Sequence, residues 1–148
     1  MNVRLVHEFR FEAAHRLPRV PAGHKCARLH GHSYIAEVAV SGEVEAATGV
    51  PEEGMVCDFA DLKEIWKHKC EPWLDHQFLN DTLPVPVTTA EWIALWIHGI
   101  FAAEVELVRD DIGIDLHYVK VWETASSYAC VSQPRAADKF LRLPSPKS

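Results

Sequence analysis

The chain has 148 residues, of which 48% are hydrophobic, and its formal net charge at pH 7 is -6. This length fits a single domain over residues 1–148, and this hydrophobic content is enough to build a core without disulfide bonds. The negative charge argues against non-specific binding to nucleic acid, which draws on a basic surface.

Alternation of apolar and polar residues predicts two strands in the first third of the chain. Residues 3–14 alternate loosely and are rich in aromatic side chains, whereas residues 32–44 alternate more cleanly. Residues 16–29 contain two prolines and a glycine, which is typical of a loop. We therefore expect two strands that run antiparallel, with this loop between them.

Two segments in the middle of the chain have the pattern of helices. Asp58 is expected to N-cap a helix that runs to about Glu71 and has one apolar face. Thr88 and Glu91 have the spacing of a capping box at the start of a second helix. This second helix is expected to run to about Val105 and, since it is apolar nearly all round, to be deeply buried.

The last part of the chain predicts two more strands. Residues 114–123 alternate again, and residues 127–133 have the pattern of a returning strand. The resulting order of two strands, two helices and two strands predicts an α+β domain, with a four-stranded antiparallel sheet and both helices on one face. Residues 134–148 are polar and contain proline, and we expect them to form a flexible tail.

The cysteines and the N-terminus bear on the compartment. Charged residues interrupt every apolar run in the first ten residues, unlike a secretory signal, and no stretch approaches the length of a membrane span. We therefore expect a reduced, cytoplasmic protein with no membrane partner and no nucleic acid partner. Three of the scattered cysteines lie in apolar settings and are expected in the core: Cys57, Cys70 and Cys130.

Histidines are concentrated near the start of the second predicted strand. His30 and His32 are two residues apart, so in an extended chain both side chains point to the same side. His15 ends the neighbouring predicted strand. Three neutral imidazoles leave the fourth position of a tetrahedral zinc ion open, which is typical of catalytic zinc sites. The alternative is a chance group of surface histidines; the third histidine and the nearby Cys26 favour a metal.

Cys26 has two interpretations. It lies close to Lys25 and Arg28, and both positive charge and a nearby metal favour a thiolate. A thiolate here is suited to take a proton from a substrate hydroxyl bound to the zinc. Its spacing before His30 also permits a role as a fourth ligand that closes the site, and the residues alone leave this choice open.

Two further acidic positions attract attention. Asp75 precedes His76, and a carboxylate beside a histidine can orient the ring as part of a proton relay. Glu123 ends a predicted strand, where a carboxylate can accept two parallel N–H bonds from a flat, guanidine-like edge. The alternative for each is a solvated charge at the end of a helix or strand.

Several motifs follow one another along the chain: FEAAHRL at residues 11–17, GHKC at 23–26, LHGHSY at 29–34, VCDF at 56–59, LDH at 74–76, TAE at 89–91 and ET at 123–124. In this order they resemble the 6-pyruvoyltetrahydropterin synthase superfamily, from about Phe9 to Ala129. Three residues separate Cys26 from His30. That gap is similar to the one in bacterial 6-carboxytetrahydropterin synthases of queuosine biosynthesis, whereas pyruvoyl-forming enzymes typically have a longer gap.

The resemblance implies a tunnelling fold, with trimers whose sheets join into a barrel and that stack in pairs as hexamers. It implies zinc on His15, His30 and His32, and Cys26 as the proton acceptor. Asp75 and His76 are then expected to complete a relay that reaches the cysteine across a subunit boundary. Glu123 is expected to anchor the pterin ring and to take part in the same relay.

The implied reaction converts 7,8-dihydroneopterin triphosphate into 6-carboxytetrahydropterin, acetaldehyde and triphosphate. Three cationic side chains are candidates for binding the triphosphate on charge alone: Arg16, Lys25 and Arg28. The first alternative is a pyruvoyl-forming synthase, which leaves the side chain uncleaved. The second is a non-catalytic zinc-binding module in which Cys26 is a ligand. A non-haem iron oxygenase is a third, but its site needs two histidines and a carboxylate, which three histidines suit poorly.

Overall fold

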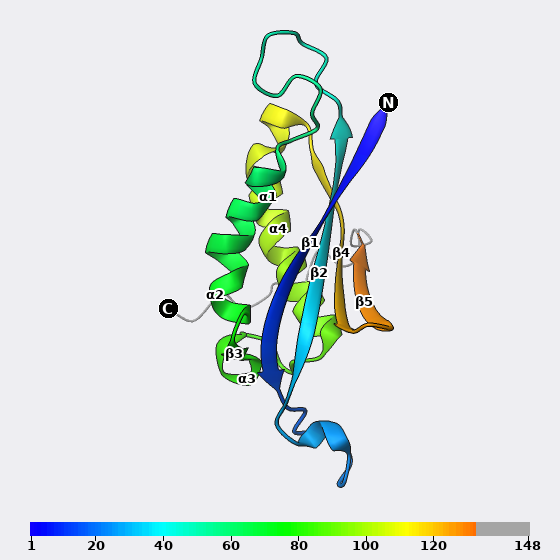
Figure 1. Cartoon of the computed structure of the whole chain (residues 1–148), viewed down its shortest axis with the longest axis vertical. Helices are drawn as coiled ribbons and strands as arrows, with labels where there is room; N and C mark the ends of the chain where they lie inside the picture. The colour runs from blue at the N-terminus through cyan, green and yellow to red at the C-terminus, as the bar shows by residue number, and fades with distance from the viewer. Residues whose placement is uncertain (133–148) are drawn as a thin grey trace.

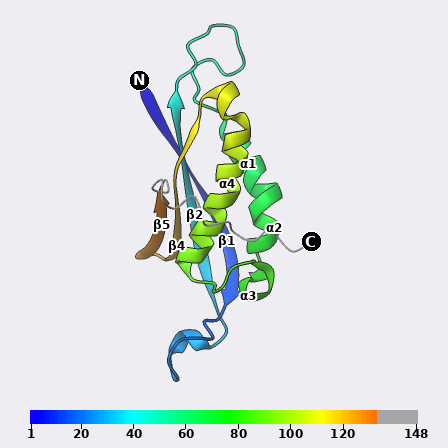
Figure 2. The same ribbon diagram turned by 180° about the vertical axis from the view of Figure 1, so that it is seen from behind.

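The structure, a computed structural model, describes residues 1–132, and for residues 109–112 it describes the backbone alone. The expected tail over residues 134–148 lies outside the described residues. A twisted sheet forms one layer, and the helices form a second layer that covers one face of the sheet, as the two opposite views show (Figures 1 and 2). The predicted α+β class is confirmed, and both layers are seen in these views.

The sheet contains five strands in the order β3-β1-β2-β4-β5. Four of them are antiparallel and match the four strands expected from sequence: β1 (Asn2–His15), β2 (His30–Glu43), β4 (Asp115–Thr124) and β5 (Ser127–Ser132). The predicted count of four was wrong by one, because β3 (Gln77–Phe78) pairs in parallel with the end of β1. Two residues are too few to produce a readable alternation.

The first helical segment is continuous but changes its winding. It comprises α1 (Phe59–Ile65), a π-helical turn η2 (Trp66–Cys70) and α2 (Glu71–Leu74). Asp58 caps it as predicted, because its Oδ1 accepts a hydrogen bond of 2.8 Å from the Ala60 nitrogen. A short helix that the sequence did not predict, α3 (Leu79–Thr82), follows β3.

The second long helix, α4 (Ala90–Ile112), starts one residue later than the capping box predicts. The Thr89 carbonyl accepts the Ile93 N–H at 3.0 Å, and the Thr89 side-chain oxygen lies 3.5 Å from the Trp92 nitrogen. Thr89 is therefore the N-cap. Thr88 precedes the helix, and its carbonyl accepts a hydrogen bond from a histidine ring described below.

The core lies between the sheet and the helices. The inward face of β2 carries Tyr34, Ala36, Val38 and Val40, all buried, as its alternation predicts. In β4 the alternation is broken by a bulge, since Tyr118 and Leu116 pair with the consecutive residues Ala39 and Val40 of β2, and His117 is the extra residue between them. Leu116 therefore lies on the buried face with Val119, whereas a regular alternation over residues 114–123 would place these two residues on opposite faces.

The cysteines divide between core and surface. Cys57 and Cys70 are buried as expected, but Cys130 is exposed. Cys130 pairs with Lys120 on the face of the sheet that the helices do not cover, while its neighbours Ala129 and Val131 pack against the core. Within residues 1–132, no helix has the length and apolar character needed to cross a membrane.

Candidate metal centre and active site

The pairing of β1 with β2 brings three histidines together. His15 lies opposite His30, and Ala13 lies opposite His32, so all three rings lie on the face that the helices cover. His15 is 1% exposed, and the other two are partly buried. One ligand nitrogen from each ring lies within 4.8 Å of the others. The structure thus brings together the three predicted metal ligands.

Hydrogen bonds to carbonyl groups orient two of these rings. His15 Nδ1 lies 2.7 Å from the Thr88 carbonyl, and His30 Nδ1 lies 2.7 Å from the Arg28 carbonyl. A carbonyl only accepts, so each Nδ1 carries the proton and each Nε2 keeps its lone pair. The two Nε2 atoms lie 3.0 Å apart. Such a partner on the second ring nitrogen is the usual companion of a metal-binding histidine.

His32 supplies the observation that tests the fit of a metal. Its Nε2 is buried and has no hydrogen-bond partner among the described residues. A buried nitrogen without a partner is costly, and a cation removes that cost. Zinc–imidazole bonds are about 2.0–2.1 Å long, so nitrogens on one tetrahedral zinc ion lie roughly 3.4 Å apart. The 3.0 Å between the His15 and His30 nitrogens is close to this value, and the three residues fit a zinc ion.

Burial also favours the form of the rings that binds a metal. Desolvation lowers the pKa of His15 and the pKa of His32 from the ordinary 6.5, although the nearby Glu123 opposes this shift in both. Neutral rings are the metal-binding form. The Glu123 Oε1 atom lies 3.3 Å from His15 Nε2 and 3.5 Å from His32 Nε2. This carboxylate therefore points toward the histidines from the end of β4.

The loop that joins β1 to β2 extends beyond the ends of both strands (Figure 1), and Cys26 lies in this loop. A short 3-10 turn, η1 (Lys25–Ala27), holds it: the Cys26 nitrogen donates to His24 Nδ1 at 3.1 Å, and its carbonyl accepts from the Leu17 nitrogen at 2.7 Å. Among the described residues, the group whose ligand atoms lie within 4.8 Å of one another does not include Cys26. The cations suggested for triphosphate are all exposed around this loop: Arg16, Lys25 and Arg28.

Asp75 and His76 form a separate pair at the outer edge of β1. His76 Nδ1 lies 2.9 Å from Asp75 Oδ2, and the pair is attached to the backbone of Glu12, whose nitrogen donates to Asp75 Oδ1 at 2.9 Å. Burial alone raises the pKa of Asp75, but its hydrogen bonds from Glu12 and His76 outweigh this and lower it. His76 has a positive φ of 57° and a 79% exposed side chain, so its ring faces solvent.

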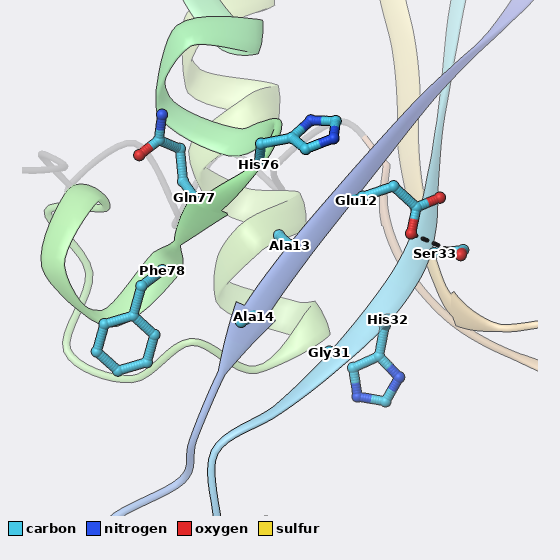
Figure 3. Close-up of a pocket in the computed structure, with 9 residues that line it drawn as sticks. All are labelled: Glu12, Ala13, Ala14, Gly31, His32, Ser33, His76, Gln77 and Phe78. Carbon is cyan, nitrogen blue, oxygen red and sulfur yellow. Dashed lines mark hydrogen bonds between the residues drawn. The ribbon is translucent and has the colours of Figure 1, made fainter.

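A shallow pocket of about 500 Å³ lies beside this pair, and both His76 and His32 are among the residues that line it (Figure 3). The Glu12 side chain points across it and accepts a hydrogen bond of 2.7 Å from Ser33. Within residues 1–132, the described hydrogen bonds and ion pairs of His76 are with Asp75 and the Glu12 backbone, not with Cys26. No contact among the described residues of this one chain therefore joins His76 to Cys26.

Sequence reasoning missed the partners that orient the ligands. The carbonyl groups of Thr88 and Arg28 carry no sequence signal, because any residue offers a carbonyl. Asn80 of α3, which bonds to the backbone just after His15, is a missed residue whose type is informative, since asparagine side chains commonly bond to backbone groups.

The sequence matches the profile of the family described as 6-pyruvoyl tetrahydropterin synthase over residues 4–134. The chain belongs to this family. It is 43% identical to a 6-carboxy-5,6,7,8-tetrahydropterin synthase of Synechocystis over 129 residues, which are 86% of this chain and 92% of that one. It is 31% identical to a dihydroneopterin monophosphate aldolase of Pyrococcus furiosus over 83% of this chain and 91% of that one.

Solved structures give the same result for the fold. The 6-pyruvoyl tetrahydropterin synthase of Caenorhabditis elegans superposes with a TM-score of 0.71 at 25% identity, covering 90% of this chain and 97% of that one. The tunnelling fold expected from the motifs is therefore confirmed. The family also confirms the resemblance on which the roles of the site residues were predicted.

Proposed function

We propose that this protein is a zinc-dependent 6-carboxytetrahydropterin synthase that acts in the cytoplasm in queuosine biosynthesis. The observation that carries the proposal is the convergence of three histidine rings, two of them fixed by carbonyl groups and the third with an Nε2 that is buried without a hydrogen-bond partner in the described part of the chain. Similarity to the Synechocystis synthase supports the choice of substrate, 7,8-dihydroneopterin triphosphate.

His15, His30 and His32 would hold the zinc and leave one position for substrate. A zinc ion held there would act as a Lewis acid and would lower the pKa of the side-chain hydroxyls of the substrate. Cys26 then accepts a proton as a thiolate, beside the positive charges of Lys25 and Arg28. That Cys26 lies outside the group of ligand atoms supports the role of base over that of fourth ligand.

Glu123 is suited to hold the pterin ring. Its carboxylate lies within 3.3 Å and 3.5 Å of two of the proposed ligands, so a substrate bound to the metal lies within its reach. A pterin presents an amino group and a ring N–H side by side, and a carboxylate accepts both. Arg16, Lys25 and Arg28 remain the candidates for the triphosphate, since all three are exposed on the same loop.

The relay requires a second subunit. His76 faces solvent at the outer edge of β1, away from the Cys26 of its own chain in the described contacts. β3 pairs with only two residues of β1, which leaves most of that edge open within the described part of the chain. Open strand edges favour association. We therefore propose a homo-oligomer built from trimers, in which Asp75 and His76 of one subunit approach Cys26 of another.

One experiment tests the reaction. The purified protein is incubated with zinc and dihydroneopterin triphosphate, and the pterin product is identified by mass spectrometry. The proposal expects 6-carboxytetrahydropterin with one equivalent each of acetaldehyde and triphosphate. A pyruvoyl product identifies the first alternative, and an aldolase product identifies the chemistry named for the Pyrococcus relative. Substrate that remains unchanged under these conditions supports the non-catalytic zinc-binding module.

A further inference from the structure

Asn80 of α3 bonds twice to the backbone that directly follows a proposed metal ligand. Its Nδ2 donates to the Arg16 carbonyl at 2.8 Å, and its Oδ1 accepts from the Arg16 nitrogen at 2.9 Å. Paired donor and acceptor contacts to one residue are what a neighbouring strand provides. β3 pairs with Ala13 and Ala14, so the Asn80 side chain extends the support of this edge past His15.

Asn80 also contacts Thr88, the residue that bonds to the ring of His15. The Thr88 hydroxyl lies 3.4 Å from Asn80 Oδ1, and Thr88 is 2% exposed. The carbonyl of Thr88 accepts the hydrogen bond from His15 Nδ1. Asn80 thus contacts both the residue covalently attached to His15 and the residue that fixes the orientation of its ring.

We propose that Asn80 is a positioning residue for the metal centre. It joins the end of β1 to the loop before α4, two segments that are more than 70 residues apart in sequence and that together set the position of His15. A metal ligand must be held both at its backbone and at its ring, because a small displacement of one ligand weakens the whole site. The inference rests on the proposed zinc centre and adds the residue that aligns it.

Metal binding by three variants tests the inference. Zn²⁺ affinity is measured by competition with a chromophoric chelator, and Co²⁺ is added separately because its visible absorption reports the geometry of its ligands. Asn80→Ala removes both hydrogen bonds to Arg16 and the contact with Thr88. Asn80→Asp keeps the acceptor but sets a carboxylate oxygen against the Arg16 carbonyl. Thr82→Val is the matched control, because Thr82 also lies in α3 and donates to a backbone carbonyl, that of Trp73 at 2.8 Å, without a contact to Arg16 or Thr88 in the described structure.

The expected result is a loss of about 10-fold in Zn²⁺ affinity for Asn80→Ala and for Asn80→Asp, with an altered Co²⁺ spectrum. Thr82→Val should keep the wild-type affinity and spectrum even where its unfolding temperature falls. Wild-type metal binding in both Asn80 variants would overturn the inference and leave the zinc centre intact. Failure of the wild-type protein to bind either metal would overturn the centre itself. If Asn80→Ala does not fold, the Zn²⁺ affinity of Asn80→Asp alone decides whether the inference holds.

Discussion

His15 and His30 lie directly opposite each other in the pairing of β1 with β2, and their Nε2 atoms are 3.0 Å apart. Each ring donates its Nδ1 proton to a main-chain carbonyl, so the two lone pairs face each other. Two such atoms repel unless a cation lies nearby. The strand register therefore brings together a group that could hold a metal ion, and His32 completes it from the same face.

Replacing a member of this group should abolish metal binding. For His30→Ala and His32→Ala we expect near-total loss of zinc, because two imidazoles hold the ion far more weakly than three. Zinc content after gel filtration, measured by atomic emission, checks this. His68→Ala is the matched control, since His68 lies exposed on the helical segment and pairs with Glu64. A full equivalent of zinc in either site variant would contradict the assignment.

The sequence was sufficient to predict this group because it depends on strand geometry. His30 and His32 are spaced by the repeat of a strand, and His15 ends the strand that pairs with theirs. The same reasoning predicted the buried face of Tyr34 and Ala36, since both depend on a regular alternation. Features with a repeat of two residues are readable from one sequence.

Features that depend on a single backbone contact were not predictable. The bulge at His117 reverses the faces of β4, and no local signal marks it. The N-cap is Thr89 and not the predicted Thr88, because the Thr88 carbonyl accepts a hydrogen bond from the ring of His15, 73 positions earlier in the chain. The strand β3 has only two residues. Each of these depends on a partner distant in sequence, which local patterns do not report.

Cys26→Ala separates a base from a ligand. We expect it to keep zinc and substrate binding but to lose turnover by roughly 10²–10⁴-fold, the usual contribution of a general base. Steady-state rates and zinc content, measured on the same preparation, check both parts. Loss of zinc together with activity would identify Cys26 as a fourth ligand. Unchanged zinc with unchanged turnover would contradict both interpretations.

Mixing two inactive variants tests the relay between subunits. Cys26→Ala and His76→Ala should each have little activity alone, because each lacks one member of the proposed relay. Unfolded and refolded together, they should form mixed oligomers in which some sites hold an intact Cys26 from one chain and an intact His76 from another. Activity should then return in part, as measured by product formation. No recovery in oligomers proven to be mixed would argue that the relay lies within one chain.

Acid should destabilise the protein partly through His98. Burial lowers the pKa of His98 below 6.5, and within residues 1–132 its buried Nε2 has no hydrogen-bond partner. The unfolded chain therefore binds a proton more readily than the folded one, and stability falls as pH decreases from about 6.5 toward the folded-state pKa. In EDTA, His98→Leu should reduce this loss by at most about 1.4 kcal/mol per pH unit. The free energy of unfolding in urea, measured at pH 7.5 and 5.5 for the wild-type protein and for His98→Leu, checks this prediction. An equal change with pH in the two proteins would refute it.

Glu123→Gln should weaken pterin binding and leave the zinc content unchanged. The substitution keeps the size of the side chain but replaces one acceptor oxygen with a donor, which then faces a donor on the pterin edge. A buried donor left unpaired costs about 1–3 kcal/mol, and more where a charge is lost. Calorimetry with a pterin ligand and zinc analysis on the same sample provide the measurement.

The position of Glu123 makes the zinc measurement informative. Its Oε1 lies 3.3 Å from His15 Nε2 and 3.5 Å from His32 Nε2, close enough for the carboxylate to take part in metal binding. Reduced zinc in Glu123→Gln would therefore reassign it from the pterin to the metal. Glu64→Gln, an exposed glutamate on α1, controls for the loss of one negative charge. Wild-type pterin affinity with full zinc would mean that the ring is held elsewhere, and that the carboxylate at the end of β4 serves neither ligand.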